Sequence, residues 1–596
     1  MRTSSIFSIS LISFAIQTIA DSGCKCLPSE PCWPSKSEWT ALNESIFGHL
    51  IQSSPPAAVC FPSQPSYNAS ECNLILAAWT SSVFHADNPV SIDGSIWANN
   101  SCNPIYPNGT SISGNPNAGV NGCSIGAYPV YVINVTEASH VQATFKFASK
   151  HNVRLNIKNT GHNGAGRSTA FGSLSLWTHN LKGITLDDSF RITADNTTGT
   201  VAQKAVTIGA GVQDGELFDK LIAQKAFAVG GTNADVGVVG WATGGGHGVM
   251  TGAYGQGADN IIEATLVTPT GKILTANEKQ NTDIFWAIRG GGGGTFGVTL
   301  NMTLKAYPDP NLTTLAVSIT GKNATSTEAW WDVIAGYLGV VPQAQDKGVH
   351  GYFTVGMNPK TLADALLAWN KDNATVEAAI LPLKQFLSEA ASHGTIDYTR
   401  GPMPITTFSD LLKLLPSVET VGRQSTITAS RLITREASLN RNLFAKTLQE
   451  VGPTGSTKLN GSVPDRTVSG TLTISREPVD NALNPIWRNT TLHLNVAQPW
   501  DDSIAEPDVK SLIDDMTYNS LDKLRRFDPA SGAYLNEANA YEPGWQLSLF
   551  GQNYGRLREI KNKYDPTGLL YCRQCVGSED WIEASSGGLC KAFVPL

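Results

Sequence analysis

Three glycine-rich runs are the residues of this 596-residue chain whose types and spacing point most directly to chemistry. The first run, residues 159–167, reads Asn-Thr-Gly-His-Asn-Gly-Ala-Gly-Arg and carries one histidine, His162. The second covers residues 230–248 and the third covers residues 289–297. Glycine lets a backbone approach a ligand closely, and bare N–H groups in such loops form anion-binding nests. Three runs in one segment therefore predict a long diphosphate cofactor rather than a single phosphate.

The pattern of apolar residues places the first glycine run at the end of a strand. Residues 129–135 predict a strand, residues 136–150 a helix, and residues 153–158 a strand that leads into the run. Residues 261–268 and 272–275 predict a hairpin, since Pro-Thr-Gly separates them. This mixture predicts an α+β domain.

A second region begins beyond Pro308-Asp309-Pro310. Residues 326–338 and 361–389 predict helices, and residues 471–476 and 490–496 predict strands. These elements predict a domain with an antiparallel sheet covered by helices. The expected organisation is a signal peptide (1–20), a cysteine-rich lead-in (21–122), a ligand-binding domain (123–307), a substrate domain (308–540) and a C-terminal segment (541–596).

The N-terminus predicts export from the cell. Arg2 precedes a mostly apolar stretch, residues 6–19, and small residues stand before Asp21, as in secretory signals. Twelve Asn-x-Ser/Thr sequences mark positions that can be glycosylated in a secreted protein. No later segment is long and apolar enough to span a membrane. The net charge of −7 and the lack of a basic block argue against nucleic-acid binding.

Ten cysteines follow the predicted cleavage site, and an even count in an exported chain predicts disulfides. Seven precede residue 124 and three follow residue 571, so complete pairing requires a bridge between the two ends. The C-terminal segment is therefore expected to pack near the start of the chain. Cys572 and Cys575 form a single Cys-x-x-Cys, for which a structural disulfide is favoured over a metal site. No metal is expected.

The motifs resemble those of FAD-linked oxidases of the vanillyl-alcohol oxidase/PCMH superfamily, in the berberine-bridge-enzyme-like branch. The resemblance covers about residues 125–305 and 530–577. Within this branch, the chain looks most like fungal secreted members, which are either isoamyl-alcohol-oxidase-like or natural-product tailoring oxidases. It implies a two-part PCMH-type FAD-binding domain beside a substrate domain. The matching landmarks, in chain order, are Thr160-Gly161-His162, residues 236–248, Asp259-Asn260, residues 289–297, residues 553–557 and residues 563–566.

The resemblance also implies which residues hold FAD. His162 matches the histidine that bonds to the flavin 8α-methyl group. Many members add a 6-S-cysteinyl bond, but Asn233 stands at that position and no cysteine lies between Cys123 and Cys572. A single covalent tether through His162 is therefore expected. The remaining cofactor contacts are expected from Thr160, Gly161, Asn163, Gly164, Gly166, Gly237, Gly240, Gly244, Gly245, Gly246 and Asn553.

The catalytic base is left open by the sequence. Plant relatives often read Tyr-x-Asn-Tyr-Arg-Asp, where the second tyrosine is the base in some of them. Here Tyr534 and Asn536 match, while Glu537 replaces the second tyrosine. A carboxylate accepts a hydroxyl proton when its pKa is suitable. The candidates are Glu537, Tyr534 and a residue of the central sheet, with minor weight on His247 and on His493.

The implied activity is oxidation of an alcohol, sugar or natural-product intermediate by hydride transfer to flavin N5. O2 is the expected electron acceptor, which would yield hydrogen peroxide. Two alternatives stay open: an oxidative cyclase with the same cofactor, and a flavin-less secreted glycoprotein that binds a ligand. A nicotinamide-dependent dehydrogenase fits poorly, because the chain lacks a clear strand-GxGxxG-helix unit. The oligomeric state is not indicated.

Overall fold

A computed structural model gives the structure of residues 23–192, 201–414, 420–584 and 586–592. The predicted signal peptide, residues 1–20, lies outside these described residues. No helix within the described ranges combines the length and the apolar character needed to cross a lipid bilayer.

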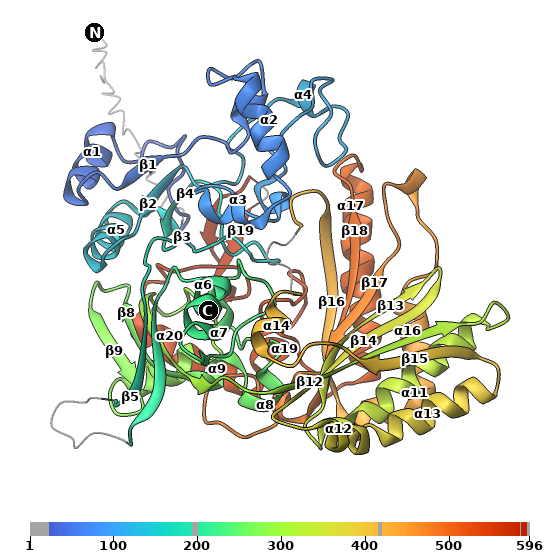
Figure 1. The fold of residues 1–596 in the computed structure, drawn as a ribbon. Helices are drawn as coiled ribbons and strands as arrows, with labels where there is room; N and C mark the ends of the chain where they lie inside the picture. The colour runs from blue at the N-terminus through green and yellow to red at the C-terminus, as the bar shows by residue number, and fades with distance from the viewer. Residues whose placement is uncertain (1–22, 193–200, 415–419, 585, 593–596) are drawn as a thin grey trace, which may run out of the picture.

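Two sheets build the half of the molecule that carries the glycine runs (Figure 1). In the first, parallel pairing joins β4 (Ser173–Trp177) to both of its neighbours, β2 (Tyr131–Asn134) and β3 (Arg154–Lys158), and the short β1 (Leu50–Gln52) forms an edge. The second sheet is antiparallel and has the spatial order β5 (Ile184–Phe190), β6 (Gln203–Gly209), β10 (Val298–Lys305), β8 (Ile261–Val267) and β9 (Ile273–Asn277). The predicted strands before the first run and the predicted hairpin are confirmed, as is the helix between those strands, α5 (Ala138–His151).

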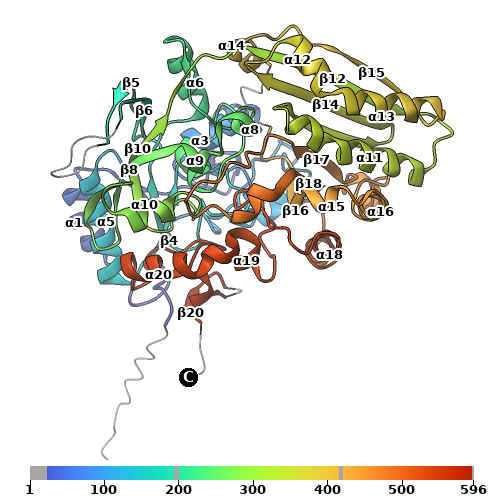
Figure 2. The ribbon, with the colours of Figure 1, turned by 90° about the horizontal axis from the view of Figure 1, so that it is seen from below.

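A seven-stranded antiparallel sheet dominates the other half of the molecule. Its spatial order is β15 (Ile396–Pro402), β12 (Leu312–Gly321), β14 (Lys360–Trp369), β13 (His350–Met357), β17 (Thr467–Thr471), β18 (Thr490–Trp500) and β16 (Ser425–Thr434). One face is covered by α11 (Thr327–Gln345), α13 (Leu381–Ser392), α16 (Arg441–Val451) and α18 (Leu521–Phe527) (Figure 2). The expected α+β fold with an antiparallel sheet covered by helices is confirmed.

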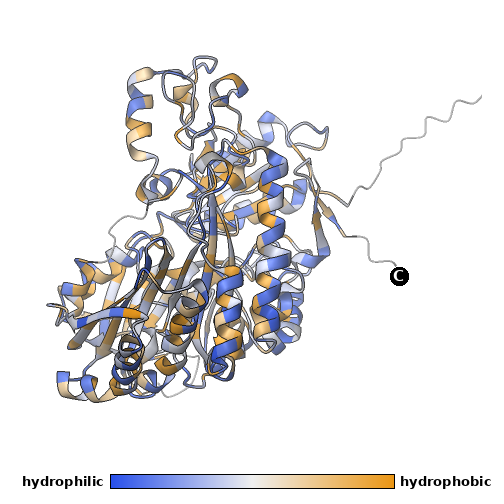
Figure 3. Cartoon of the chain, turned by 90° about the vertical axis from the view of Figure 1, so that its right-hand side faces the viewer, coloured by the Kyte–Doolittle hydropathy of each residue, from blue (hydrophilic) through white to orange (hydrophobic). Residues whose placement is uncertain are grey.

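The covering helices are amphipathic, and their apolar residues form a core with the sheet. Figure 3 shows both hydrophobic and hydrophilic residues along the longer helices. Trp330, Ile334 and Leu338 of α11 are fully buried against apolar strand residues such as Leu494. A spacing of three to four residues places these three side chains on one helix face. The other face of the sheet is therefore left to the glycine runs and the site described below.

The prediction of one helix over residues 361–389 is wrong in its first part. Residues 360–369 form β14, and only afterwards do α12 (Asn373–Ala379) and α13 follow. Alanine and leucine favour a helix in isolation, but β14 pairs along its whole length with both β12 and β13. The predicted strand over 471–476 is also displaced, because β17 ends at Thr471.

The two ends of the described chain are joined covalently. Cys24 and Cys590 form a disulfide across 566 positions, and the backbone N–H of Lys591 donates to the Gly23 carbonyl at 2.7 Å. The bridge between the ends that the cysteine count required is thus confirmed, and so is the disulfide between Cys572 and Cys575. The remaining cysteines pair within the lead-in as Cys26–Cys32, Cys60–Cys72 and Cys102–Cys123.

Removal of the Cys24–Cys590 bridge is expected to destabilise the protein more than removal of the Cys572–Cys575 bridge. A bridge that closes a long loop restricts the unfolded chain more, and such bridges contribute about 2–4 kcal/mol. The double variants Cys24→Ser/Cys590→Ser and Cys572→Ser/Cys575→Ser serve as a matched pair. Thermal unfolding of both at equal concentration measures the difference, and an equal loss in Tm would contradict the expectation.

Candidate active site

The second and third glycine runs meet backbone to backbone, and the Asn159 side chain of the first run lies against the second. The first follows β3, the second contains α7 (Val238–Thr243), and the third follows α10 (Thr282–Ile288). A side-chain carbon added at Gly237 would lie 2.4 Å from Asn159 of the first run. One added at Gly293 would lie 3.6 Å from the Cα atom of Gly240. Glycine is needed here because no larger residue lets the chains approach so closely.

Each run also exposes one glycine. Gly164, Gly240 and Gly293 are exposed although most of their neighbours are buried. At Gly164 and Gly240, no other heavy atom lies within 4 Å of the place where a side-chain carbon would stand. Bare backbone beside open space is what a nest for a phosphate group requires. We call these three exposed glycines, Gly164, Gly240 and Gly293, together the glycine hollow.

Other glycines expected to contact the cofactor set the paths of the runs. At each one, a neighbouring side chain lies within 2.8 Å of the place where a side-chain carbon would begin. These contacts are Gly166 with Trp97, Gly244 with Asn536, Gly245 with Leu483, and Gly246 with Trp241. Their contribution to a cofactor site is therefore the shape of the loops.

The polar residues expected beside the cofactor also hold the loops in shape. Asn163 Oδ1 accepts the backbone N–H groups of Ala165 and Arg167 at 3.1 and 3.0 Å. Thr160 Oγ1 accepts the N–H of His162 at 3.5 Å. Asn553 lies apart from the first run.

Asn553 lines a cavity of about 620 Å³, together with Arg488 and Arg556. Its Nδ2 donates to the Leu483 carbonyl at 3.0 Å. Because Leu483 packs against Gly245 and Gly290, Asn553 supports the second and third glycine runs from behind.

His162 stands partly exposed on the first run, beside Gly164. Its side chain is 28% exposed, and its Nδ1 lies 2.8 Å from Oδ2 of Asp93. A partly exposed imidazole next to the hollow is placed where a ligand can reach it. Gly161, immediately before it, has a φ of +92°, a conformation that a residue with a side chain rarely adopts.

Arg167 is a residue of this region that the sequence reasoning missed. It donates from Nη1 to the Leu535 carbonyl at 3.0 Å and from Nε to the Arg573 carbonyl at 2.9 Å. Its Nη2 is buried and has no hydrogen-bond partner among the described residues. Burial lowers the pKa of Arg167 to about 10, although the nearby Tyr534 opposes this, so the guanidinium stays charged. The feature of the sequence that could have indicated a role for Arg167 is its position directly after Gly166, the last glycine of the first run.

The residues present fit FAD. The glycine hollow offers bare N–H groups suited to a pyrophosphate, and the partly exposed imidazole of His162 stands beside it. The unpaired Nη2 of Arg167 suits a carbonyl or phosphate oxygen, because buried donors in proteins are normally satisfied.

Glu537, His247 and His493 form the second part of the site. His247 belongs to the second glycine run, and its Nε2 lies 2.8 Å from Oε1 of Glu537. His493 lies on β18 between Leu492 and Leu494, which face the helices, so its side chain is on the opposite face of the sheet. Its Nδ1 lies 3.6 Å from Oε2 of Glu537. The hydroxyl groups of Thr428 and Ser430 hold the backbone carbonyl of Glu537.

Opposite charges keep Glu537 ionised in this setting. Burial opposes the charge of the carboxylate, but the charge and hydrogen bond of His247 outweigh it, and His493 and His162 add to the effect, so the pKa falls to about 2. Burial lowers the pKa of His493 to about 4, although Glu537 opposes this. At neutral pH the site therefore contains a carboxylate and a neutral His493.

A cavity of about 490 Å³ opens in front of these three residues. Two rows of paired residues on the uncovered face of the sheet line it. One row contains Tyr352, Thr471 and His493, and the other contains Thr354, Ser469 and Asn495. Alanines at positions 316, 363 and 365 leave the space open. The cavity thus has a mostly apolar lining that includes several polar side chains, and a titratable end.

Tyr534 is buried and lies behind this titratable end. Its ring packs edge-on against the rings of His247, His493 and Trp487 at centroid distances of 5.1, 5.8 and 5.6 Å. Its hydroxyl accepts a hydrogen bond from Asn536 Nδ2 at 2.8 Å. Burial raises the pKa of Tyr534 well above its usual value, and the charge of Glu537 raises it further, so the phenol stays protonated.

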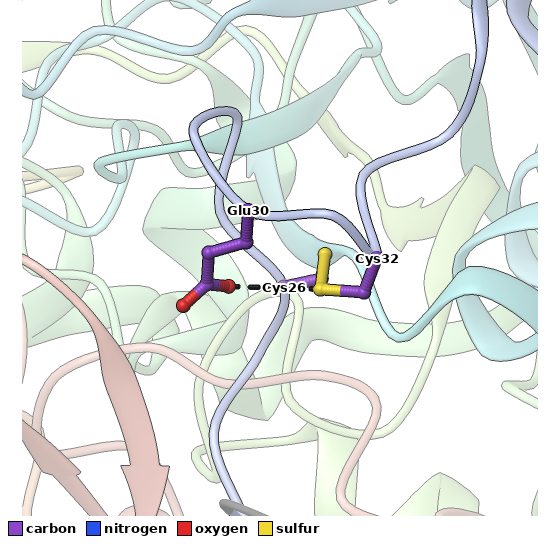
Figure 4. Close-up of side chains that lie close together, drawn as sticks. All are labelled: Cys26, Glu30 and Cys32. Atoms are coloured by element: carbon purple, nitrogen blue, oxygen red, sulfur yellow. Dashed lines mark hydrogen bonds between the residues drawn. A yellow bond between two sulfur atoms is a disulfide. The ribbon is translucent and has the colours of Figure 1, made fainter. Parts of the chain in front are cut away.

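Two groups of side chains in the described part of the chain have the spacing of metal ligands. In the first, Cys26 and Cys32 are joined in a disulfide beside Glu30 (Figure 4), so neither sulfur is available as a thiolate. The second is the cluster of His247, His493 and Glu537, whose donor atoms lie within 4.8 Å of one another. In that cluster the contact between His247 and Glu537 has the length of a hydrogen bond.

Comparisons with known proteins identify the family. Residues 129–277 match the family described as FAD binding domain, and residues 533–577 match the one described as berberine and berberine like. The chain is 34% identical over 571 residues to FAD-linked oxidoreductase ZEB1 of Gibberella zeae, covering 96% of this chain and 95% of that protein. The VAO-type flavoprotein MtVAO615 of Myceliophthora thermophila C1 has a crystal structure that matches with a TM-score of 0.84 at 31% identity, covering 96% and 100% of the two chains.

A more distant structure shares the fold alone. Glucooligosaccharide oxidase from Acremonium strictum matches with a TM-score of 0.62 at 17% identity, covering 85% of this chain and 99% of that chain. It is described as holding 6-S-cysteinyl, 8α-N1-histidyl FAD. Because ZEB1 and MtVAO615 match along nearly the full length of both chains, the resemblance inferred from the glycine runs is confirmed. The chain belongs to the FAD-linked oxidoreductases of the vanillyl-alcohol oxidase type, in their berberine-like branch.

Proposed function

We propose that this enzyme is a secreted oxidase that removes a hydride and a proton from an alcohol group of a small polar molecule and uses O2 as its electron acceptor. The observation that carries the proposal is the contact between Glu537 and His247 at the end of the cavity. Residues 123–307 and 541–596 would hold FAD, and residues 308–540 would form the substrate domain. Bound FAD would supply the hydride acceptor.

Glu537 and His247 are suited to take the substrate proton as a pair. A carboxylate whose pKa is about 2 is by itself a weak base. The low pKa of Glu537 belongs to the state in which His247 is positively charged. When His247 is neutral, a proton that reaches Glu537 can pass across the 2.8 Å contact to His247 Nε2, and the carboxylate then stabilises the imidazolium. The side chain of Glu537 is 37% exposed, so substrate can approach it. Tyr534, protonated and buried, would position the two histidine rings.

The cofactor would be tethered once, through His162. The imidazole lies beside Gly164 of the glycine hollow, and Asn233 replaces the cysteine of doubly tethered relatives. A covalent bond would keep the flavin on a secreted enzyme, outside the compartment where FAD is made.

The cavity suits a substrate that presents a few polar groups within a mostly apolar lining. Asn495 Oδ1 and His493 Nε2 belong to lining residues, are buried, and have no hydrogen-bond partner in the described ranges. Buried polar atoms are normally satisfied, so a bound molecule with donor and acceptor groups would complete them. Hydroxyl groups of Thr354 and Ser469 line the same cavity.

Glu537→Gln is expected to lower kcat by about 10²-fold or more, because a well-placed base contributes roughly 10²–10⁴-fold. Tyr534→Phe, which removes one hydroxyl at equal size, is expected to lower kcat less than about tenfold. Steady-state peroxide release from both variants and the parent, each with its flavin content measured, makes the comparison. A larger loss in Tyr534→Phe would assign the base to tyrosine.

If the pair acts as a unit, losses from Glu537→Gln and His247→Gln do not add in the double variant. Treatment with a chelator should leave activity unchanged, since proton transfer through the pair requires no cation. Additive losses would contradict the paired role, and a loss of activity that zinc restores would assign the cluster to a metal.

The flavin is expected to remain on the polypeptide after denaturation. Flavin fluorescence of the band after denaturing electrophoresis measures this, and peptide mass spectrometry locates the tether. His162→Ala is expected to release all flavin on denaturation, because no second tether is present. A covalent flavin that persists in His162→Ala would contradict the single-tether proposal.

A substrate screen tests the proposed reaction itself. Peroxide release is followed with alcohols, sugars and aromatic natural-product alcohols, and product masses are determined. The proposal expects an aldehyde, ketone or lactone that is two hydrogens lighter than the substrate. A new ring formed by oxidation would instead identify the cyclase alternative. A colourless protein after expression with ample riboflavin would identify the binding glycoprotein.

A further inference from the structure

The cysteine-rich lead-in places a carboxylate on His162. Asp93 lies 69 positions before the histidine, yet its Oδ2 approaches His162 Nδ1 to 2.8 Å. The Asp93 side chain is only 12% exposed. At this distance the carboxylate oxygen stands directly against the imidazole nitrogen, in ion-pair contact with it.

The backbone that carries Asp93 is anchored to the strand that carries His162. Lys158, the last residue of β3, donates from Nζ to the carbonyls of His85, Ala86 and Asn88 at 3.0, 3.4 and 2.8 Å. The side chain of Asn88 in turn accepts the backbone N–H groups of residues 90 and 91. The buried ammonium therefore holds the segment before Asp93 at the start of the first glycine run.

Gly161 lets this segment contact the histidine loop directly. A side-chain carbon at Gly161 would lie 3.2 Å from the Cα of Ile92 and 3.3 Å from the Ser91 carbonyl oxygen. Gly161 directly precedes His162, and Ile92 directly precedes Asp93. The loop and the lead-in therefore pack closely just beside the contact between Asp93 and His162. This packing fixes the carboxylate against the imidazole.

Three other carboxyl groups, those of Asp214, Asp235 and Glu537, interact electrostatically with His162. Burial raises the pKa of Asp214 to about 8, partly offset by the Gly231 N–H and by His162, so Asp214 is mostly protonated at neutral pH. Burial also raises the pKa of Asp235, and His162 opposes that rise. The carboxylate of Asp93 lies at contact distance from His162 Nδ1.

We propose that Asp93 is the residue that accepts the imidazole proton of His162 when this histidine is joined to FAD. The inference rests on the proposed tether at His162. In the joining step one imidazole N–H bond and one C–H bond of the flavin 8α-methyl group break, and one C–N bond forms. The imidazole proton goes to Asp93, the methyl proton goes to solvent, and two electrons reduce the flavin. O2 then takes up two electrons and two protons to give one hydrogen peroxide.

The lead-in would then have two roles. It would help attach FAD when the enzyme matures, and it would pack against the rest of the protein as a segment held by disulfides. Removal of the proton leaves the imidazole nitrogen with a free electron pair, which is the form that can attack carbon. The role of Asp93 ends once the bond is made, so it is a residue for attachment and is separate from the base of substrate oxidation. This separation makes the inference testable without substrate.

The test uses full-length protein produced in a riboflavin-starved host and then supplied with FAD. Covalent flavin is followed over time by fluorescence of the denatured band, and peroxide released without substrate is measured against it. Asp93→Asn keeps the size of the side chain and an oxygen that can accept a hydrogen bond, but it cannot hold the proton at neutral pH. The matched control is Asp87→Asn, since Asp87 lies in the same lead-in, contacts a different histidine, His179, at 3.2 Å, and is 66% exposed.

Attachment in Asp93→Asn is expected to be slower by roughly 10²-fold, the lower end for a lost proton acceptor, while Asp93→Glu recovers part of the rate. The parent and Asp87→Asn should attach FAD at the same rate and release about one peroxide per flavin, as the balanced step requires. Fluorescence quenching of added FAD and thermal unfolding establish that Asp93→Asn still folds and binds the free cofactor.

Equal attachment rates in Asp93→Asn and the parent would overturn the inference and leave the tether itself intact. A parent protein that releases all its flavin on denaturation would overturn the proposed tether, and the inference with it. Slow attachment caused only by failed FAD binding would assign Asp93 a structural role and would also overturn the inference.

Discussion

The close contact of three glycine runs is the constraint on which the rest of the site depends. At Gly237, Gly244 and Gly245 a neighbouring side chain already lies where a side-chain carbon would stand. The lack of a side chain lets Asn159 of the first run approach Gly237, and lets Asn536 and Leu483 pack against Gly244 and Gly245. The same absence leaves the backbone bare at Gly164 and Gly240, where open space begins. Packing and ligand binding therefore draw on one sequence feature.

Charge is distributed so that the site keeps one ionised group near the cavity. Glu537, with its pKa of about 2, contributes stability above the usual pKa of a glutamate and loses it as pH falls toward 2. His493, with its pKa of about 4, is buried neutral, so the unfolded chain takes up its proton first and stability is lost as pH falls from about 6.5 to 4. Both groups therefore make the folded protein less stable in acid.

The sequence was most informative where a residue type has a narrow structural role, as glycine and cysteine do here. The glycine runs, through their resemblance to a known family, indicated the cofactor class, and the odd division of cysteines required a bridge between the two ends of the chain. The sequence was least informative where contacts between distant segments determine the local structure. Residues 360–369 read as a helix and became a strand, because two neighbouring strands pair with them along their length.

The same limit applies to the site. Alternation along residues 490–496 left open which face His493 occupies, and only the burial of Leu492 and Leu494 under the helices decides it. No local signal links Asp93 with His162, or Tyr352 with the cavity, because those contacts join segments that are distant in the chain. The replacement of a tyrosine by Glu537 was visible in the sequence, but its contact with His247 was not.

A crystal structure of the purified protein tests the central claim most directly, that the glycine hollow holds the flavin between His162 and the pair of Glu537 and His247. The account predicts electron density for FAD along Gly164, Gly240 and Gly293, continuous with the His162 ring, and with the isoalloxazine facing the cavity that Glu537 lines. Flavin density elsewhere, for example in the cavity beside Asn553, or a hollow closed by protein side chains, would contradict it.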